Sequence, residues 1–200
     1  MSEVLKYFLP VYLLLYFGAA FLWRSFLVWK RTGLNPYTLG HSDTPHDFVG
    51  GLFQLTLGLI VVVILIYSIS SEWYALLAPI LWLQHPALVV AGLMLLGLSL
   101  IWTLIAQAQM GEAWRIGIDT QHKTELVQRG VFRLSRNPIF LGTRVAVLGF
   151  FLILPNALTL TTLVLGEALM QIQVRLEEEH LLRLHGERYQ AYRQRVRRWL

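Results

Sequence analysis

Residues 48–69 read FVGGLFQLTLGLIVVVILIYSI, a stretch that contains no charged side chain. About 20 apolar residues in a helix are enough to cross the hydrocarbon core of a bilayer. The rest of the chain has the same character, since 56% of its 200 residues are apolar and only 14% are charged. Soluble domains are typically about half apolar and a quarter charged. The sequence therefore predicts an all-α integral membrane protein.

Similar apolar runs lie on both sides of this stretch. They occupy residues 7–29, 86–106, 139–154 and 157–174, so we expect about five transmembrane helices. Pro155 and Asn156 separate the last two runs and predict a tight turn between antiparallel helices. The apolar piece at 73–83 is too short to span and contains Pro79, so we expect an interfacial helix or an ordered loop there.

The basic residues predict the orientation of the chain. Lys30 and Arg31 follow the first apolar run instead of preceding it, which argues against a cleavable signal peptide. By the positive-inside rule this places the amino terminus outside. The arginine-rich loop 107–138 and the carboxyl-terminal tail are then cytoplasmic. Because the basic residues flank apolar segments, the net charge of +5 does not indicate a nucleic-acid partner.

Residue types argue against several kinds of site. The chain has no cysteine, and therefore no thiolate nucleophile, disulfide or CxxC metal motif. Zinc spacings such as HExxH are also missing, although the first loop holds His41, Asp43, His46 and Asp47. Residues 44–47 (TPHD) are typical of a helix start, with Thr44 as the cap and Pro45 at the first helical position. We predict no metal site.

The chemically richest stretch is the polar loop at 110–142, because loops this long are usually functional. Asn137 and Pro138 are good residues for the cap and the first position of a helix, and a helix start can also bind a carboxylate. In the last helix one polar stripe recurs every three or four residues and consists of Glu167, Gln171, Arg175 and Glu178. Polar side chains at membrane depth are functional candidates.

Two charges, Arg144 and Glu167, fall inside the last two apolar runs. At 1.5 Å per residue they lie roughly 10 and 15 Å from the cytoplasmic end. Either charge alone would cost a few kcal/mol at this depth, so we expect the two side chains to pair. The pair either holds the hairpin closed or presents Arg144 to the polar head of a substrate.

The order of short motifs in the back half resembles a known family. Gly130 and Phe132 precede RNPIFLG at 136–142, and after a hairpin come EEEHLL at 177–182, Gly186, Tyr189, Tyr192 and Val196. In order and spacing this is similar to the carboxyl-terminal module of the isoprenylcysteine carboxyl methyltransferases, which are related to the phospholipid methyltransferases. The chain then divides into a three-span membrane region, residues 1–106, and a methyltransferase module, residues 107–200.

The resemblance implies methyl transfer from S-adenosylmethionine to a lipid-like or isoprenoid-type acceptor that enters from the bilayer. It implies cofactor contacts at Thr124, Glu125, Leu126, Val127, Gly130, Phe132, Arg136, Asn137, Pro138, Ile139, Phe140 and Glu178. The acceptor-side catalytic candidates are Glu177, Arg175 and Arg144. Trp114, Phe132 and Phe140 are candidates to face the sulfonium, since a cation is attracted to aromatic rings.

The sequence departs from the family's pattern at three places. Asn137 and Phe140 stand where histidine and tyrosine are usual, Thr124 where histidine is common, and Gln173 where a substrate-side arginine would fall. The Asn137 amide can still donate a hydrogen bond, so we expect cofactor binding to be retained. These changes leave the identity of the acceptor open.

Two other functions remain open from the sequence. A membrane sterol-type reductase has a similar terminal module, but it uses NADPH and is a longer chain. A transporter or scaffold derived from the family would need no cofactor, and the altered RNPIF motif is its best support. Titration with S-adenosylmethionine and NADPH distinguishes the three functions.

Overall fold

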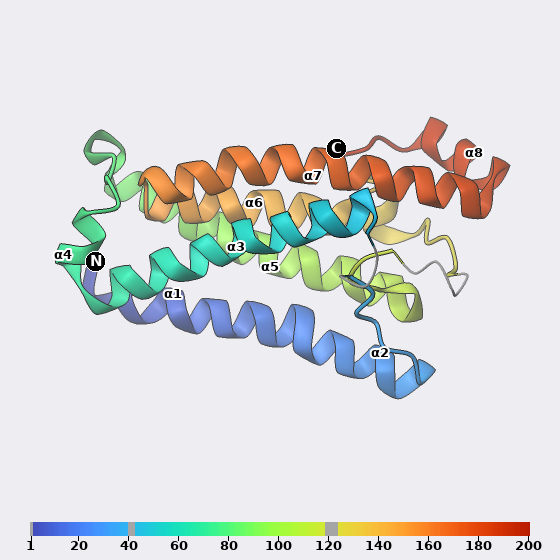
Figure 1. Ribbon diagram of the computed structural model, residues 1–200, viewed down its shortest axis with the longest axis horizontal. Coiled ribbons are helices and arrows are strands. Elements are labelled where there is room, and N and C mark those ends of the chain that lie inside the picture. The colour runs from blue at the N-terminus through green and yellow to red at the C-terminus, as the bar shows by residue number, and fades with distance from the viewer. Residues whose placement is uncertain (1, 40–42, 119–123) are drawn as a thin grey trace.

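The computed structural model describes residues 2–39, 43–118 and 124–200, so His41 lies outside the described residues. Throughout these ranges the chain forms helices and no β-strand. In chain order they are α1 (Ser2–Phe17), η1 (Gly18–Trp23), α2 (Arg24–Thr32), α3 (Pro45–Ile69), α4 (Ser71–Ala75), η2 (Leu81–Leu83), α5 (Pro86–Met110), η3 (Gly111–Ala113), η4 (Gly130–Arg133), α6 (Pro138–Ile153), α7 (Ala157–His185) and α8 (Glu187–Arg195) (Figure 1). The predicted all-α class is confirmed.

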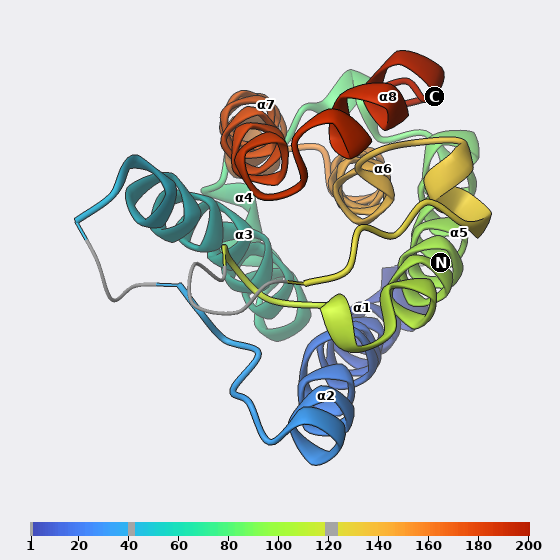
Figure 2. The ribbon, with the colours of Figure 1, turned by 90° about the vertical axis from the view of Figure 1, so that its right-hand side faces the viewer.

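The long helices run side by side along the length of the molecule (Figure 1). Viewed from one end, α6 lies between α5 and α7, α3 lies beside α7, and α1 and α2 lie below them (Figure 2). The same pairs are in contact, with α6 against α5 and α7, and α3 against α7 and α1. Large apolar side chains such as Tyr7, Leu14 and Leu55 are exposed on the outside, as expected of helices that face lipid.

Among the described residues, four helical segments are long and apolar enough to cross a membrane: Glu3–Thr32, Pro45–Ile69, Pro86–Ala113 and Ala157–His185. The helix α6 is apolar but has only 16 residues, about 24 Å at 1.5 Å per residue. A short span is accommodated by local thinning of the bilayer or by its flanking residues. The chain is a multi-pass membrane protein, and the predicted number of about five spans is compatible with the structure.

The first span is not the uninterrupted α-helix that its apolar run predicts. A π-helical segment, η1, separates α1 from α2. The amide of Gln107 in α5 donates to the Ala20 carbonyl of this segment at 2.8 Å, and Arg24 donates to the Gly111 carbonyl. Such π-helical segments often occur near functional sites.

The predicted turn between the last two spans is confirmed. Asn156 caps α7 by accepting from the Leu158 and Thr159 amides at 3.0 and 3.1 Å, and the Thr159 hydroxyl accepts from the Asn156 amide. The short segment before α5 docks on this turn, with the Ile80 amide donating to the Pro155 carbonyl at 2.8 Å. It is an ordered loop, as predicted.

Glycines allow α5 and α6 to approach closely. A Cβ atom on Gly142 would lie 2.2 Å from the Thr103 hydroxyl oxygen, and one on Gly92 would lie 2.7 Å from the Gly149 carbonyl oxygen. Small residues at such contacts are typical of helix packing in membranes. This close contact fixes the start of α6, where the RNPIF motif lies.

The tail at 175–200 is not one continuous helix. The helix α7 continues to His185, and Gly186 follows with a φ of +53°. Glycine tolerates this left-handed conformation and ends the helix. After α8 the chain turns back along α7 to the carboxyl terminus (Figure 1), so the last residues contact the bundle.

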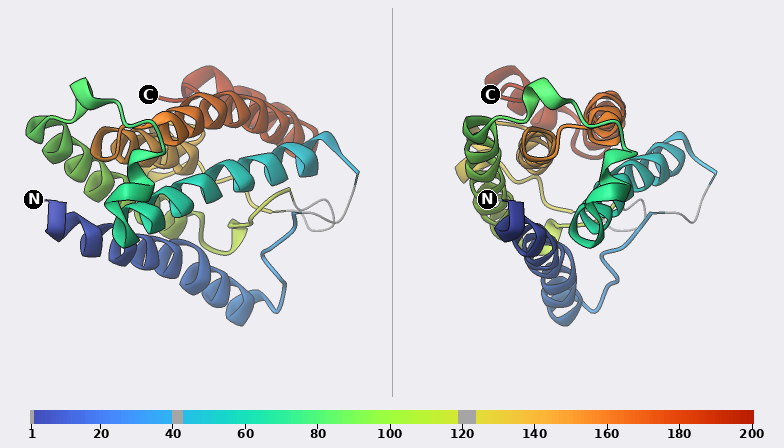
Figure 3. Two further views of the ribbon diagram at one scale, coloured as in Figure 1. Left: turned by 60° about the vertical axis from the view of Figure 1, so that its left-hand side comes forward. Right: turned by 90° about the vertical axis from the view of Figure 1, so that its left-hand side faces the viewer.

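The amino terminus and α4 lie at one end of the bundle, whereas α2 and α8 end at the other (Figures 1 and 3). If the arginine-rich end is cytoplasmic, a membrane-impermeant thiol reagent added outside should label Ala157→Cys at the hairpin turn and not Gln194→Cys in α8. Both positions are exposed, and the chain has no other cysteine. Labelling of Ala157→Cys only from the cytoplasmic side would overturn this orientation.

Candidate functional site

The Glu178 carboxylate is surrounded by three donor residues from two parts of the chain, the start of α6 and the tail. Arg136 donates to it at 3.1 and 3.2 Å, Arg198 at 2.9 and 3.1 Å, and the Asn137 amide at 3.0 Å. The Arg136 and Glu178 side chains are only 8% and 5% exposed. We call these four residues the Glu178 cluster. A buried carboxylate needs such charge-assisted partners to remain ionised.

Asn137 occupies the N-cap position of α6, but its side chain does not cap the helix. Its amide nitrogen donates to Glu178 and, at 3.3 Å, to the Arg198 carbonyl. The predicted side-chain cap is therefore wrong, because the side chain is turned toward Glu178 and the Arg198 carbonyl, to which its nitrogen donates, and its oxygen accepts from no amide of the first turn.

Hydrogen bonds made by the Glu178 cluster and by Ser135 hold the tail against the start of α6. Arg136 donates to the carbonyls of Arg193 and Val196, both at 2.9 Å, and the Ser135 hydroxyl donates to the Arg198 carbonyl. The hydrogen bonds to Glu178 raise the pKa of Arg198. Sequence reasoning missed Arg198, because nothing in the sequence distinguishes it from the other arginines of the tail.

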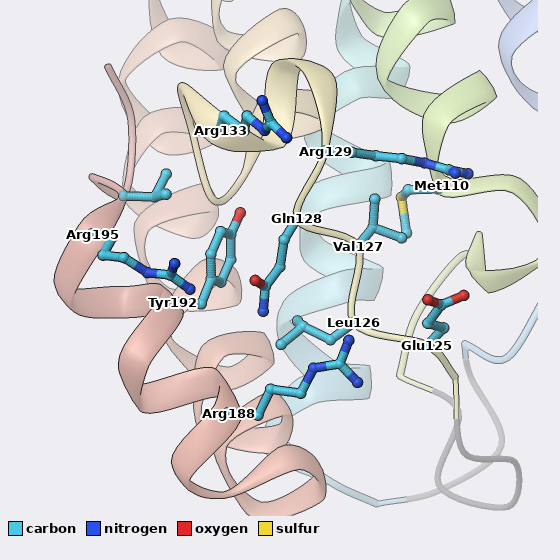
Figure 4. Close-up of a pocket in the computed structure, with 11 residues that line it drawn as sticks. Met110, Glu125, Leu126, Val127, Gln128, Arg129, Arg133, Arg188, Tyr192 and Arg195 are labelled. Carbon is cyan, nitrogen blue, oxygen red and sulfur yellow. The ribbon is translucent and has the colours of Figure 1, made fainter.

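Three of the predicted cofactor residues, Glu125, Leu126 and Val127, line an open pocket of about 660 Å³ at the arginine-rich end (Figure 4). Ligand pockets commonly have volumes of roughly 300–1,000 Å³. The other lining residues are Met110, Gln128, Arg129, Arg133, Arg188, Tyr192, Arg195 and Val196. Thr124 lines a smaller neighbouring pocket together with Glu125 and Leu126. The loop before α6 and the tail around α8 thus line the larger pocket together.

Two tyrosines of α8 support this pocket. Leu126 packs against Tyr189 and Tyr192, and the Tyr192 hydroxyl donates to the Phe132 carbonyl at 2.6 Å. Burial raises the pKa of Tyr192 to about 12, so the hydroxyl keeps its proton and remains a donor. The contact joins α8 to the loop that precedes α6.

Gly130 lies in the same loop and has a φ of +57°. A Cβ atom there would lie 2.2 Å from the Gln109 side-chain oxygen, which accepts from the Val131 amide at 2.8 Å. Only glycine fits this position without displacing Gln109. The need for a glycine at position 130 is therefore explained by the conformation of the loop and its contact with Gln109.

The remaining motif residues take separate places at the base of α6. The Pro138 carbonyl accepts from the Trp102 ring at 2.8 Å, and the Ile139 carbonyl accepts from Thr143. The Phe140 ring lies 6.3 Å from the Phe53 ring of α3. Trp114 and Phe132 are buried. The described cavities do not bring the three predicted aromatic residues together.

Of the residues predicted to lie on the acceptor side, Glu177 is on α7 beside Gln173, which contacts His46 of α3. Arg175 lies elsewhere: its side chain is exposed and donates to the Gln171 carbonyl and side chain of its own helix. Within the described residues, these hydrogen bonds of Arg175 do not involve Glu177. Thr44 caps α3 as predicted, since its hydroxyl accepts from the Asp47 amide. Within the described ranges no three His, Cys, Asp or Glu residues form a group that could hold a metal ion.

A mostly apolar cavity of about 70 Å³ lies deeper, between the first helix, α3 and α6. Its wall includes the aromatic side chains of Tyr16, Phe17, Phe21 and Phe53, and Thr143 of α6 also lines it. The cavity lies within the apolar part of the bundle. It offers an environment suited to a hydrocarbon chain.

The predicted pair of Arg144 and Glu167 is confirmed. The two side chains approach at 2.7 and 2.9 Å, and Gln171 also donates to Glu167 at 2.8 Å. The Arg144 guanidinium lies 4.2 Å from the centroid of the Trp199 ring, a cation–π contact that the sequence did not predict. The pair joins α6 and α7, and Trp199 at the end of the tail contacts its arginine.

We expect Arg144→Leu and Glu167→Leu each to lower the thermal stability of the detergent-solubilised protein. Removing one partner leaves the other charge unpaired at membrane depth, at a cost of about 2–3 kcal/mol on insertion scales. The double variant should recover part of the loss, because no unpaired charge remains. Strictly additive losses in a double-mutant cycle would show that the pair contributes no coupling.

A family model described as phospholipid methyltransferase matches residues 82–188, which is more than half of the chain. No curated protein matches the chain. The matched residues include α5, α6, α7, the pocket loop, and three of the four residues of the Glu178 cluster. The match indicates methyl transfer to a lipid-type acceptor. The chain belongs to the phospholipid methyltransferase family.

Proposed function

We propose that the protein is an S-adenosylmethionine-dependent methyltransferase that modifies a lipid-like acceptor at the cytoplasmic face of a membrane. One observation carries the proposal. Within the family match, the loop at 124–133, the base of α6 and the carboxyl half of α7 meet at one end of the bundle beside an open pocket. That end carries the arginines expected to be cytoplasmic.

The pocket residues fit the proposed cofactor. Leu126, Val127 and Met110 offer apolar surface for a purine, and the Glu125 carboxylate can accept hydrogen bonds from an ammonium or from ribose hydroxyls. Arginines on the opposite wall can pair with the carboxylate of the methionine moiety. When bound, S-adenosylmethionine would supply an electrophilic methyl group on a sulfonium: an acceptor lone pair would form the new bond to the methyl carbon in line with the breaking C–S bond, whose electron pair would leave with the neutral thioether.

The protein's own residues would then position the acceptor and handle its proton. The apolar cavity between α1, α3 and α6 can receive part of an acceptor's hydrocarbon chain. Glu177 can accept the proton of an acceptor N–H or O–H group, which is general-base catalysis.

Transfer of a labelled methyl group tests the proposal. The purified protein is incubated with S-adenosylmethionine labelled on the methyl group and with vesicles made from a total membrane lipid extract. The amount of label in the lipid-containing organic phase should increase in proportion to the enzyme concentration and the incubation time. Binding of S-adenosylmethionine without any label in the lipid would contradict transfer to a lipid-like acceptor.

A further inference from the structure

His46 lies outside the residues of the family match, yet it reaches the acceptor side of the proposed site. It is the second residue of α3, and its side chain is buried. Its Nε2 atom lies 2.5 Å from Nε2 of Gln173 in α7. Gln173 also hydrogen-bonds Glu177, one turn further along α7. His46, Gln173 and Glu177 therefore form a connected row.

The contact with Gln173 decides which nitrogen of the His46 ring carries the proton. An amide nitrogen can only donate, so Nε2 of His46 must accept and keeps its lone pair. In the neutral ring the proton is then on Nδ1. That nitrogen lies 3.8 Å from the Asp47 carboxylate, whose negative charge favours an N–H on this side of the ring. Both ring nitrogens thus have partners that match this tautomer.

The neighbours also favour one orientation of the Gln173 amide. Its nitrogen faces both His46 and Glu177, and it has two hydrogens to donate. The reverse orientation would place the amide oxygen against the Glu177 carboxylate, and the two acceptors would repel each other. In the observed orientation the buried oxygen of Gln173 is the atom that has no donor among the described residues.

We propose that neutral His46 is a positioning residue for methyl transfer, because it orients the Gln173 amide that holds the Glu177 carboxylate. This inference rests on the proposed function and on the role given there to Glu177. It assigns a task to the front half of the chain, which otherwise supplies membrane spans. His46 does not itself contact the acceptor in this arrangement.

The arrangement depends on the protonation state of His46. A proton on Nε2 would occupy its lone pair, and the ring N–H would then face the N–H of the Gln173 amide. The amide would rotate to present its oxygen to the ring, and the same rotation would turn the oxygen toward Glu177. The charged or titratable groups near the ring, among the described residues, are Asp47 on its own helix and Glu177 and His180 on α7. The turnover rate should therefore fall as the pH drops through the titration of His46.

Three variants test this dependence. His46→Phe removes the acceptor atom and should lower kcat about tenfold, the rate factor of one ordinary hydrogen bond, with little change in KM for S-adenosylmethionine. His46→Gln can place an amide oxygen near the position of Nε2, so it should keep most of the rate but lose the acidic fall in kcat. His85→Gln, at an exposed position before α5, is the control and should keep the wild-type pH profile.

A spectroscopic measurement makes the test independent of turnover. Long-range ¹H–¹⁵N spectra of histidine-labelled protein report the tautomer of each ring, and the signal lost in His46→Gln identifies His46. The Nδ1–H tautomer is expected, and Gln173→Leu should abolish the preference. The Nε2–H tautomer, or an unchanged acidic fall in kcat for His46→Gln, would overturn the inference. A protein without methyl transfer would contradict the proposed function instead, and the tautomer would still confirm or overturn the hydrogen-bonded row.

Discussion

Glu178→Gln is expected to lower the free energy of unfolding by about 3–5 kcal/mol, the usual cost of removing one partner from a buried ion pair. The substitution leaves the Arg136 guanidinium buried without its carboxylate, and it removes the anion that Arg198 contacts. The measurement is thermal or denaturant unfolding in detergent. We expect trypsin to cut the released tail faster as well, because the cluster holds the tail against α6.

Glu179→Gln is the matched control for this prediction. Glu179 follows Glu178 in sequence, but it is exposed and pairs with Arg183 on the helix surface, where the two side chains are 61% and 66% exposed. Such surface pairs contribute at most about 1 kcal/mol. If Glu178→Gln were no less stable than Glu179→Gln, the cluster would not be what holds the tail.

Glu177→Gln is expected to reduce turnover by about 10²-fold or more, the lower end of the contribution of a general base. Glutamine keeps the size of the side chain and can still meet Gln173, but it cannot take a proton from the acceptor. The affinity for S-adenosylmethionine should change little, because the pocket lined by Glu125, Leu126 and Val127 does not include Glu177. The measurement is kcat together with cofactor affinity for the variant.

The opposite result would reassign Glu177. If the variant lost cofactor affinity but turned over normally at saturating cofactor, Glu177 would belong to the cofactor pocket. The Glu179→Gln variant again controls for the loss of one negative charge on α7. It should leave both quantities near their wild-type values.

Features set by local sequence were predictable. The apolar runs predicted the helices, and Pro155-Asn156 predicted the turn, because both depend on neighbouring residues only. The pair of Arg144 and Glu167 followed from two facts, the antiparallel hairpin and the cost of an unpaired charge in a membrane. The structure contains both the turn and the pair.

Features that depend on distant parts of the chain were not predictable. The role of Asn137 changed from a helix cap to a donor for Glu178, because a carboxylate some forty residues further along the chain lies within its reach. Arg198 and Trp199 fold back onto α6 only because Gly186 breaks the tail helix. The contact of His46 with Gln173 likewise required the packing of α3 against α7. A single sequence does not show which residues of two distant segments will lie opposite each other.

Calorimetric titration of the purified protein with S-adenosylmethionine, and separately with NADPH, tests the central claim most directly. We predict saturable one-to-one binding of S-adenosylmethionine and no binding of NADPH. Val127→Trp, which fills the pocket, should weaken the binding, whereas Val164→Trp on the exposed face of α7 should not. Binding of NADPH alone, or of neither compound, would contradict the assignment of this chain as an S-adenosylmethionine-dependent methyltransferase.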